Sequence, residues 1–411
     1  MANSVYVHFE DLSRPLLLNN CSELIDHFPL VFPGWEIDTK SSPGQLPIIT
    51  INLDKEGSYR LEAEWLKKTA SYRDEVDTLC ALVAKVVKAR TLEDMNLLCL
   101  HGAAVKINST LIIFPNKYRA GKSVLATCLA AAGYQVYSDD VLPISLETGE
   151  GVAPSIAPRL RAPYPDNLDA QTRQFIESRV ALKGERYHYL DLTPDLLAPR
   201  DKRAPIGAFV FLEREEGVRP ELRAISESDV LRQVVWQNFA REIDAHSILG
   251  RLGKVVSQAQ SFTLRYDRAD AAVELLGKHF HRQDSTDERL ALRTLELQNT
   301  DLGSNDVPAG YLLRRKGISE IKSDSEAFLA DTTGSAIHHL NPVGSAIWSL
   351  LAQPITIEQI IELLLVAFPD VEANQVEADV RKLIKSLKAK NLLLVGRARS
   401  KSEDPPRVNR T

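Results

Sequence analysis

A short stretch between a predicted strand and a predicted helix has the composition of a phosphate-binding loop. The strand is the apolar run 110–114, the helix is predicted at 124–132, and residues 120–123 between them read Ala-Gly-Lys-Ser. Backbone N–H groups at the start of a helix point toward an anion, and the helix dipole favours negative charge there. We therefore expect Lys122 to contact the β- and γ-phosphates of a nucleotide and the Ser123 hydroxyl to bind Mg²⁺.

The loop departs from the Walker A pattern G-x-x-x-x-G-K-S at its first position. Asn116 stands where the pattern has glycine, and asparagine is one of the few other residues that tolerate a left-handed backbone. Lys117 and Arg119 add positive charge around the expected phosphates. The sequence predicts nucleotide binding by nine residues, which are Asn116, Lys117, Tyr118, Arg119, Ala120, Gly121, Lys122, Ser123 and Val124.

Two adjacent carboxylates, Asp139 and Asp140, follow the next predicted strand at 134–137. If that strand belongs to a parallel sheet with 110–114, both carboxylates reach the edge at which the phosphate loop lies. One carboxylate can then deprotonate an attacking hydroxyl while the other supports Mg²⁺ or its waters. Without the loop, an Asp-Asp pair is more often a solvated turn.

Hydrophobic patterns predict the elements that would hold these residues. Residues 71–90 have helical spacing with one apolar face, and residues 5–9 and 48–52 alternate like strands. Further strands are expected at 97–107, 206–212 and 260–266, and further helices at 228–240 and 269–280.

The C-terminal part has a separate pattern. After a polar linker at 281–308, with a possible helix at 288–297, residues 325–332 and 335–340 predict a hairpin around Thr333-Gly334. Three helices are expected at 342–351, 357–368 and 374–390, the second with a capping box from Thr356 to Gln359. The tail at 397–411 is polar and is expected to be disordered.

Composition limits the classes of function. The 411 residues carry a net charge of -5, which argues against a dedicated nucleic-acid binder, and their 44% hydrophobic residues exclude wholesale disorder. No apolar stretch approaches the roughly 20 residues of a membrane span, and no secretory signal is evident, so we expect a cytoplasmic protein that binds no membrane. The cysteines lack metal-ligand spacing and are expected to be buried thiols: Cys21, Cys80, Cys99 and Cys128.

A family resemblance rests on three segments in order. His101-Gly102-Ala103-Ala104-Val105, the phosphate loop and Ser138-Asp139-Asp140-Val141 together resemble the catalytic core of HPr kinase/phosphorylase. They are still more similar to the HPr-kinase-related enzymes of peptide natural-product gene clusters. The resemblance covers residues 95–145 well and 146–280 in outline. It implies an α/β (α+β) fold shared with phosphoenolpyruvate carboxykinases, and phosphorylation of a serine hydroxyl with ATP and Mg²⁺.

The resemblance also implies roles for single residues. Asp139 matches the catalytic base, and His101 matches the histidine beside the base and the transferred phosphoryl group. Lys122 is the third predicted catalytic residue, and Ser123 and Asp140 are the predicted metal ligands. By chemistry alone, His101 would more often be a structural histidine. The second signature of HPr kinases, which supports phosphorolysis, is not found, so we expect kinase activity alone.

Four basic residues are candidates for contacts with the acceptor or the γ-phosphate. They are Arg159, Arg161, Lys183 and Arg186. The competing interpretation for each is a solvated side chain on a loop.

The C-terminal part resembles PqqD, a winged-helix domain that recognises precursor peptides in ribosomal peptide pathways. The resemblance covers residues 309–395 and rests on the hairpin, the segment Leu340-Asn341-Pro342-Val343-Gly344-Ser345-Ala346-Ile347-Trp348, and the helices that follow. In that family a leader peptide adds a strand to the hairpin edge and lies against the last helix. A scaffold without a ligand, or one that binds DNA, are the alternatives.

The sequence thus predicts an ATP-dependent kinase that phosphorylates a Ser, or a Thr, of a precursor peptide held by its leader. The predicted parts are an N-terminal α/β part of the kinase body (1–94), a catalytic domain (95–280), a linker (281–308), the PqqD-like domain (309–395) and a tail (396–411). A homo-oligomer is expected by analogy. Two alternatives stay open: a kinase for a small hydroxylated metabolite such as serine, and a nucleotide-gated peptide chaperone without phosphoryl transfer.

Overall fold

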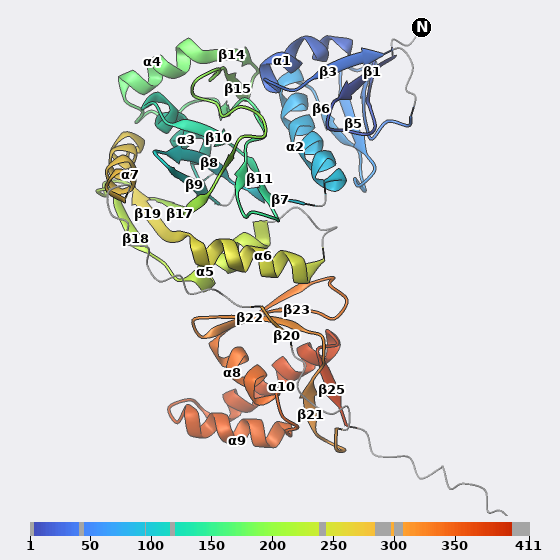
Figure 1. Cartoon of the computed structure of the whole chain (residues 1–411), viewed down its shortest axis with the longest axis vertical. Coiled ribbons are helices and arrows are strands. Elements are labelled where there is room, and N and C mark those ends of the chain that lie inside the picture. The colour runs from blue at the N-terminus through green and yellow to red at the C-terminus, as the bar shows by residue number, and fades with distance from the viewer. Residues whose placement is uncertain are drawn as a thin grey trace, which may run out of the picture. The chain divides into compact units, whose positions relative to one another are not determined.

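The chain has a mixed α/β fold, as the sequence predicts (Figure 1). The computed structural model describes residues 4–40, 45–94, 96–115, 120–237, 244–283, 297–299 and 307–396. Two compact units divide the chain. Unit 1 comprises Met1–Ile243 and Lys254–Thr294, and unit 2 comprises Asp244–Gly253 and Leu295–Thr411.

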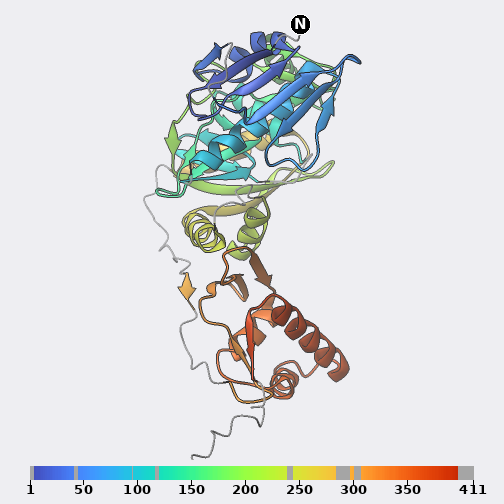
Figure 2. The same cartoon turned by 90° about the vertical axis from the view of Figure 1, so that its right-hand side faces the viewer.

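The N-terminal part of unit 1 is a six-stranded sheet with the order β3-β1-β2-β4-β5-β6. Its strands, blue in Figure 2, are β1 (Ser4–Phe9), β2 (Leu16–Asn19), β3 (Ile37–Lys40), β4 (Ile49–Leu53), β5 (Tyr59–Ala63) and β6 (Ala70–Tyr72). The strands predicted at 5–9 and 48–52 are confirmed as β1 and β4. Two short helical segments, η1 (Ser22–His27) and α1 (Phe28–Val31), follow β2.

Helix α2 (Glu75–Glu93) covers this sheet with its apolar face. The helix predicted at 71–90 is confirmed, but it begins later because residues up to Tyr72 belong to β6. The Asp74 side chain caps the helix by accepting a hydrogen bond from the N–H of Asp77 at 2.9 Å. The buried face includes Val76, Leu79, Leu82, Val83 and Val86.

A tryptophan joins the N-terminal sheet to the rest of unit 1. The indole N–H of Trp35 donates to the carbonyl of Pro154 at 2.8 Å. The guanidinium carbons of Arg90 and Arg200 lie 5.6 and 5.2 Å from the centre of its ring, and both arginines pair with Asp11. Cation–π contacts and ion pairs therefore fix the first ninety residues to the body that follows.

The central sheet of unit 1 has the order β10-β8-β9-β17-β19-β18. Its strands are β10 (Gln135–Ser138), β8 (Ala103–Ile107), β9 (Thr110–Phe114), β17 (Ile206–Arg214), β19 (Gln260–Tyr266) and β18 (Glu221–Ala224). Strands β9, β17 and β19 are parallel, while β8 is antiparallel to both β9 and β10. The sheet is therefore mixed rather than parallel. Because β9 and β10 are both antiparallel to β8, they still run in the same direction.

Helices pack against this sheet. Helix α3 (Lys122–Ala131) packs on β8 and on α7 (Ala269–Gln283), and α5 (Glu227–Gln237) and α6 (Ala245–Gln258) follow β18 in sequence. The helices predicted at 124–132, 228–240 and 269–280 correspond to α3, α5 and α7. Residues 238–240 of the second predicted helix lie outside the described residues.

A second, smaller sheet meets the central one at two points. It has the order β16-β12-β11-β7, with β7 (Leu97–His101), β11 (Val141–Ser145), β12 (Gly151–Val152) and β16 (Arg203–Ala204). The run predicted as one strand at 97–107 is two strands, because the chain leaves β7 and enters β8 at Gly102. A Cβ at Gly102 would lie 3.1 Å from the carbonyl oxygen of Phe114, so the Phe114 backbone would have to shift by a few tenths of an ångström to admit a side chain there.

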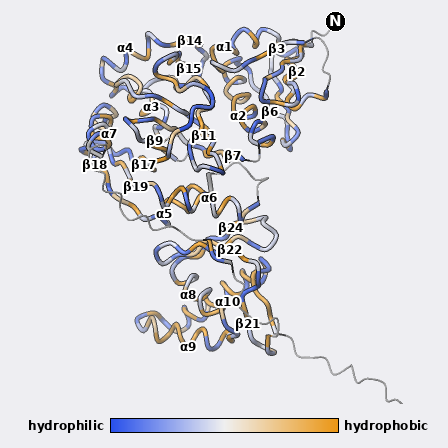
Figure 3. The backbone as a smooth tube through the Cα atoms, viewed as in Figure 1, coloured by the Kyte–Doolittle hydropathy of each residue, from blue (hydrophilic) through white to orange (hydrophobic). Residues whose placement is uncertain are grey.

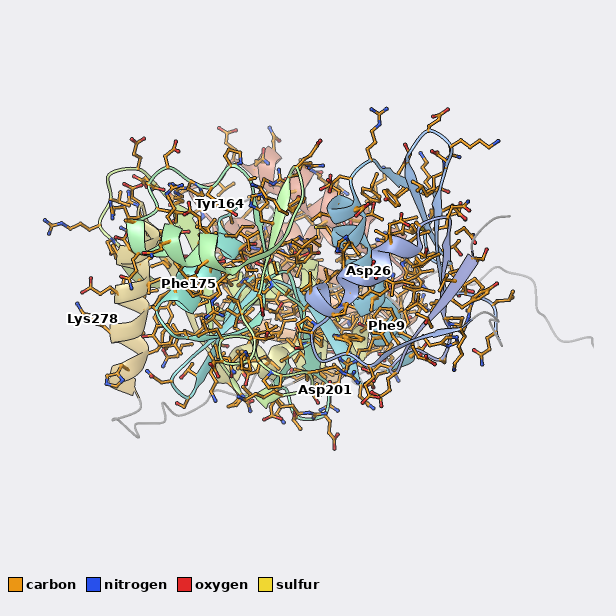
Figure 4. All side chains as sticks on the ribbon, turned by 90° about the horizontal axis from the view of Figure 1, so that it is seen from above. Phe9, Asp26, Tyr164, Phe175, Asp201 and Lys278 are labelled. Atoms are coloured by element: carbon orange, nitrogen blue, oxygen red, sulfur yellow. The ribbon has the colours of Figure 1, made fainter. Side chains whose placement is uncertain are left out.

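A third sheet of unit 1 has the order β13-β15-β14, with β13 (Arg159–Arg161), β15 (Tyr187–Leu190) and β14 (Val180–Lys183). Helix α4 (Ala170–Arg179) precedes β14 and is capped by Asp169, whose side chain accepts from the N–H of Thr172. Neither α4 nor α6 is among the helices predicted from the sequence. Figure 4 shows Tyr164 and Phe175 in this part of unit 1.

Among its described residues, unit 2 contains a sheet with the order β20-β22-β23-β24, three helices that follow this sheet in the chain, and the first part of α6, from Ala245 to Gly253. The strands are β20 (Gln298–Asn299), β22 (Ser319–Ser323), β23 (Glu326–Ala330) and β24 (Ile337–Leu340), and β21 (Leu312–Arg314) pairs with β25 (Leu393–Val395). The helices are α8 (Pro342–Leu350), α9 (Ile357–Ala367) and α10 (Ala373–Ala389). The hairpin, the three helices and the capping box of Thr356 and Gln359 are confirmed. Figure 3 shows apolar and polar residues alternating along α9 and α10.

Some predictions fall where nothing is described. The possible helix at 288–297 lies, except for its last residue, outside the described residues, and so does the tail at 397–411. Within the described ranges, no helix combines the length and the apolar character that crossing a membrane requires.

Trp348 fills the core of unit 2, where its side chain is fully buried. We predict that Trp348→Ala lowers the free energy of unfolding of unit 2 by about 3–5 kcal/mol, the usual cost of such a cavity. Val366→Ala is the matched control, because Val366 is 81% exposed and its loss should cost less than about 0.5 kcal/mol. Scanning calorimetry measures both, and equal melting temperatures for the two variants would refute this packing role.

Candidate active site

Helix α3 begins at the phosphate loop predicted from the sequence. Gly121 is the N-cap residue with φ +91°, a left-handed conformation that favours glycine, and Leu125 N–H donates to its carbonyl at 3.0 Å. The Thr127 hydroxyl donates to the carbonyl of Ser123 at 2.8 Å. Of the nine predicted nucleotide-binding residues, Ala120 to Val124 lie at this helix start, and residues 116–119 lie outside the described residues.

Gly121 gives a prediction with a matched control. A Cβ there would lie 3.1 Å from the Tyr266 hydroxyl, whereas Gly133 has nearly the same φ, +93°, with nothing within 4 Å. Alanine at either position should cost about 1–2 kcal/mol of stability, because both backbones are left-handed. We predict that only Gly121→Ala also weakens ATP binding in titration calorimetry. Equal ATP affinity in the two variants would contradict the role of this turn.

The two points where the sheets meet bring His101 and the acidic pair together. His101 ends β7 and Asp139-Asp140 joins β10 to β11, and the register pairs His101 with Val141. Gly102 N–H donates to the Asp140 carbonyl at 2.9 Å. The Ser138 hydroxyl lies 2.7 Å from the Val141 carbonyl and 3.3 Å from the Gly102 carbonyl. Backbone pairing therefore positions side chains that are almost forty residues apart.

Asp139 is a buried carboxylate with an unsatisfied oxygen. Its Oδ2 accepts a hydrogen bond from Arg159 N–H at 3.1 Å, while Oδ1 has no hydrogen-bond partner among the described residues. Burial raises the pKa of the Asp139 carboxyl above its usual value, although the Arg159 guanidinium and the Ser123 hydroxyl oppose the shift. A carboxylate of raised pKa accepts a proton more readily than an ordinary aspartate.

Asp140 lies in a different electrostatic environment. Its Oδ2 accepts from the Arg159 guanidinium at 2.7 Å, and its Oδ1 lies 3.2 Å from His101 Nδ1. Burial acts to raise the pKa of Asp140, but Arg159, His101 and Lys122 outweigh it and hold that pKa below its usual value. Asp140 therefore stays ionised while its neighbour holds protons more tightly.

Lys122 and His101 complete the group. Lys122 is 7% exposed, and its Nζ lies 3.4 Å from His101 Nε2. Burial lowers the pKa of the Lys122 ammonium, although Asp140 and Asp139 oppose that shift, and burial also lowers the pKa of His101. A neutral imidazole with its proton on Nδ1 satisfies both contacts, since it donates to Asp140 and accepts from Lys122.

Helix α2 forms part of the surroundings of Arg159. Arg159 pairs with Tyr189 of β15 and lies near Cys80 of α2. Burial acts to lower the pKa of Arg159, but neighbouring groups, with Asp140 first among them, outweigh burial and hold that pKa well above its usual value. The first ninety residues therefore contribute to the surroundings of this arginine. All four cysteines of the chain are buried thiols, as predicted: Cys21, Cys80, Cys99 and Cys128.

These side chains line one cavity of about 290 Å³. The predicted residues in its wall are His101, Ala120, Gly121, Lys122, Ser123, Val124, Asp139, Asp140, Arg159 and Arg161. Two of the basic candidates do not line it. Arg186 instead pairs with Asp77 of α2 at 3.2 Å, and the Lys183 side chain is exposed.

Part of the wall is absent from the site residues predicted from the sequence, namely Leu160, Pro163, Pro165, Tyr187 and Arg214. The position of Arg214 at the end of a strand is a signal that could have located it. Arg214 is the last residue of β17, which is parallel to β9, so it ends at the edge of the sheet where β9 leads into the phosphate loop. No comparable signal marks Tyr187, because its place depends on the pairing of β13 with β15.

The donors in the cavity fit Mg²⁺. Ser123 and Asp140, the two predicted metal ligands, both line the cavity and offer the oxygen ligands that Mg²⁺ prefers. The described residues hold no group of three His, Cys, Asp or Glu side chains arranged as a complete metal cage. Such a site suits an ion that keeps several waters and binds substrate phosphates.

Comparisons with known proteins give one family match and one structural similarity. Residues 323–393 match the family described as coenzyme PQQ synthesis protein D (PqqD), which confirms the PqqD-like domain expected at the C-terminus. Among solved structures, the chain is similar to the Hpr(Ser) kinase/phosphatase from Coxiella burnetii. The identity is 12%, the TM-score is 0.25, and the similarity covers 46% of this chain and 97% of that one. No curated protein matches the sequence.

Proposed function

We propose that the chain is an ATP-dependent kinase that phosphorylates a Ser, or less often a Thr, of a ribosomally made precursor peptide. The observation that carries this proposal is the cavity at the start of α3, where Lys122, Ser123 and the two carboxylates converge. Helix N-termini favour phosphate, and the paired carboxylates have pKa values shifted in opposite directions. That combination suits phosphoryl transfer to a hydroxyl.

Asp139 is proposed as the base. The acceptor oxygen bonds to the γ-phosphorus while the bond from that phosphorus to the bridging oxygen breaks, and ADP leaves. The hydroxyl proton passes to Asp139, whose burial raises its pKa and whose Oδ1 is free of hydrogen bonds within the described residues. Asp140 keeps Arg159 and His101 in place beside it.

Lys122 is proposed to neutralise the phosphate oxygens as charge develops on them, together with the N–H groups of residues 120–124. Mg²⁺, held by Ser123 and Asp140 with its waters, would supply further positive charge. His101 accepts a hydrogen bond from Lys122 and orients Asp140, so the histidine holds both groups in place.

The PqqD-like domain is proposed to capture the leader of the precursor. Unit 2 has a hairpin of β23 and β24, in which β24 is the edge strand, and its last helix is α10. In the PqqD family, to which unit 2 is similar, a leader binds to the hairpin edge and to the last helix. Tethering the leader raises the local concentration of the acceptor, to roughly millimolar levels for a short flexible connection. The protein is proposed to act in the cytoplasm and, by analogy with HPr kinases, to form a homo-oligomer.

Kinetics with two substrates test leader capture. The substrates are a precursor peptide encoded beside the gene for this chain and its core segment without the leader. We expect a much higher KM for the leaderless peptide with little change in kcat, because the leader contributes binding rather than chemistry. Equal KM values for the two peptides would remove the recognition role of unit 2.

A further inference from the structure

The charge of the cavity lining is unbalanced. Among the described residues of its wall, Lys122, Arg159, Arg161 and Arg214 are cationic, and only Asp139 and Asp140 are carboxylates. Lys122 and Arg159 belong to the cluster around the two carboxylates. The proposed phosphoryl transfer already has Lys122 and Arg159 as cations beside the carboxylates. Arg161 and Arg214 add two further positive charges to the cavity lining.

Strand pairing sets the place of Arg161. Arg159 and Arg161 lie two residues apart on β13 and so point to the same side of the strand, and Tyr187 pairs with Arg161 across β15. The Arg161 guanidinium donates to the Tyr187 hydroxyl at 2.6 Å and lies 5.2 Å from the centre of its ring. The tyrosine therefore orients the arginine, which lowers the entropic cost of binding an anion.

Arg214 reaches the cavity from a different element. It ends β17, and its guanidinium donates to the Asn167 side-chain oxygen at 3.0 Å. Two guanidiniums from separate strands thus face one cavity, and guanidinium groups bind carboxylates through paired hydrogen bonds.

The distance between Arg159 and Arg161 along β13 indicates how far from the proposed base a bound anion would lie. The backbone N–H of Arg159 contacts Asp139, the proposed base, and Arg161 lies two residues farther along the strand. Two residues of a strand span about 6.6 Å. An extended acceptor with its hydroxyl at Asp139 would therefore bring a group one or two residues away to Arg161.

We infer that Arg161 and Arg214 bind a carboxylate of the acceptor, so that the kinase selects a Ser or Thr with an Asp or Glu within two residues. This inference rests on the proposed function, and it names the class of peptide that the site accepts. The α-carboxylate of free serine is another source of the same chemistry.

Binding and transfer are measured with three probes. Two are blocked pentapeptides, Ac-Gly-Gly-Ser-Glu-Gly-NH2 and the same peptide with Gln in place of Glu, and the third is free L-serine. We expect the Glu peptide to bind about 10- to 100-fold more tightly than the Gln peptide, as a charge-assisted hydrogen bond predicts. Its kcat/KM should be higher by a similar factor, mostly through KM. A preference for serine over both peptides would assign the carboxylate to a free amino acid instead.

Two variants separate the anion site from its surroundings. Arg161→Met should abolish the preference for Glu over Gln and leave the KM for ATP unchanged. Arg186→Met is the matched control, because Arg186 also lies near the Tyr187 ring, at 5.6 Å, but does not line the cavity. It should keep the preference.

The outcomes distinguish the inference from the proposed function. Equal binding of both peptides would overturn the inference. A raised KM for ATP in Arg161→Met would also overturn it, and would assign these arginines to the nucleotide. If the Glu peptide binds more tightly through Arg161 but gains no phosphate, the carboxylate site stands and the kinase proposal fails.

Discussion

Asp139→Asn is expected to bind ATP with unchanged affinity and to transfer phosphate about 10²- to 10⁴-fold more slowly, the usual contribution of a general base. An amide has the shape of a carboxylate but does not accept the proton of the acceptor hydroxyl. The backbone N–H of Arg159 still finds an acceptor in the side-chain oxygen of asparagine, so the local geometry is kept. Radiolabelled transfer assays and ATP titrations measure the two effects.

The same substitution should not destabilise the fold at neutral pH. A carboxyl whose pKa is raised in the folded state favours folding when protonated, and that stability is lost as the pH rises from its unfolded pKa through its folded pKa. Asparagine has no proton to lose there, so its melting temperature at pH 7 should equal or exceed that of the wild type. Asp166→Asn, which neutralises an exposed carboxylate, is the control for activity. Full activity in Asp139→Asn would reject this residue as the base.

Lys122→Met is expected to weaken ATP binding by about 2–5 kcal/mol, because it removes a buried charge that is proposed to face the phosphates. Methionine has a similar length and an apolar stem, so it fits the same buried position. The loss should be larger for ATP than for adenosine, since the ammonium group is proposed to contact the phosphates alone. Titration calorimetry with both ligands measures this difference.

Lys278→Met is the control for the loss of a lysine. Lys278 is exposed on the outer side of α7, where it pairs with Glu274 (Figure 4). ATP affinity should be unchanged in this variant. If Lys122→Met bound ATP as tightly as Lys278→Met does, the phosphate site would not lie at the start of α3.

Local sequence predicts the phosphate loop, because its parts are neighbours in the chain. Strand β9, the loop and α3 follow one another, and the Gly121 turn needs no distant contact to be recognised. The meeting of His101 with Asp140 is different. It depends on the pairing of β7 with β11 and on the position of β8 between β9 and β10, and only the family resemblance made that meeting predictable.

Elements with weak hydrophobic patterns could not be predicted. Strand β22 has the sequence Ser-Glu-Ile-Lys-Ser, and its Glu320 is buried because Arg314 pairs with it at 2.9 Å. Helix α4 is mostly polar, with Thr172 and Ile176 as its buried residues. A tertiary ion pair and a narrow contact face replace the usual patterns in these two elements, so the sequence alone does not reveal them.

The most direct test of the account is the ratio of two products in one reaction. The chain is incubated with ATP, Mg²⁺ and the full-length precursor, and ADP is quantified together with the peptide that is about 80 Da heavier, the mass of one added phosphate. We predict one phosphopeptide for each ADP formed, with both products formed about 10²- to 10⁴-fold more slowly in Asp139→Asn. ADP formed without a phosphorylated peptide would contradict the account and indicate a nucleotide-gated peptide chaperone.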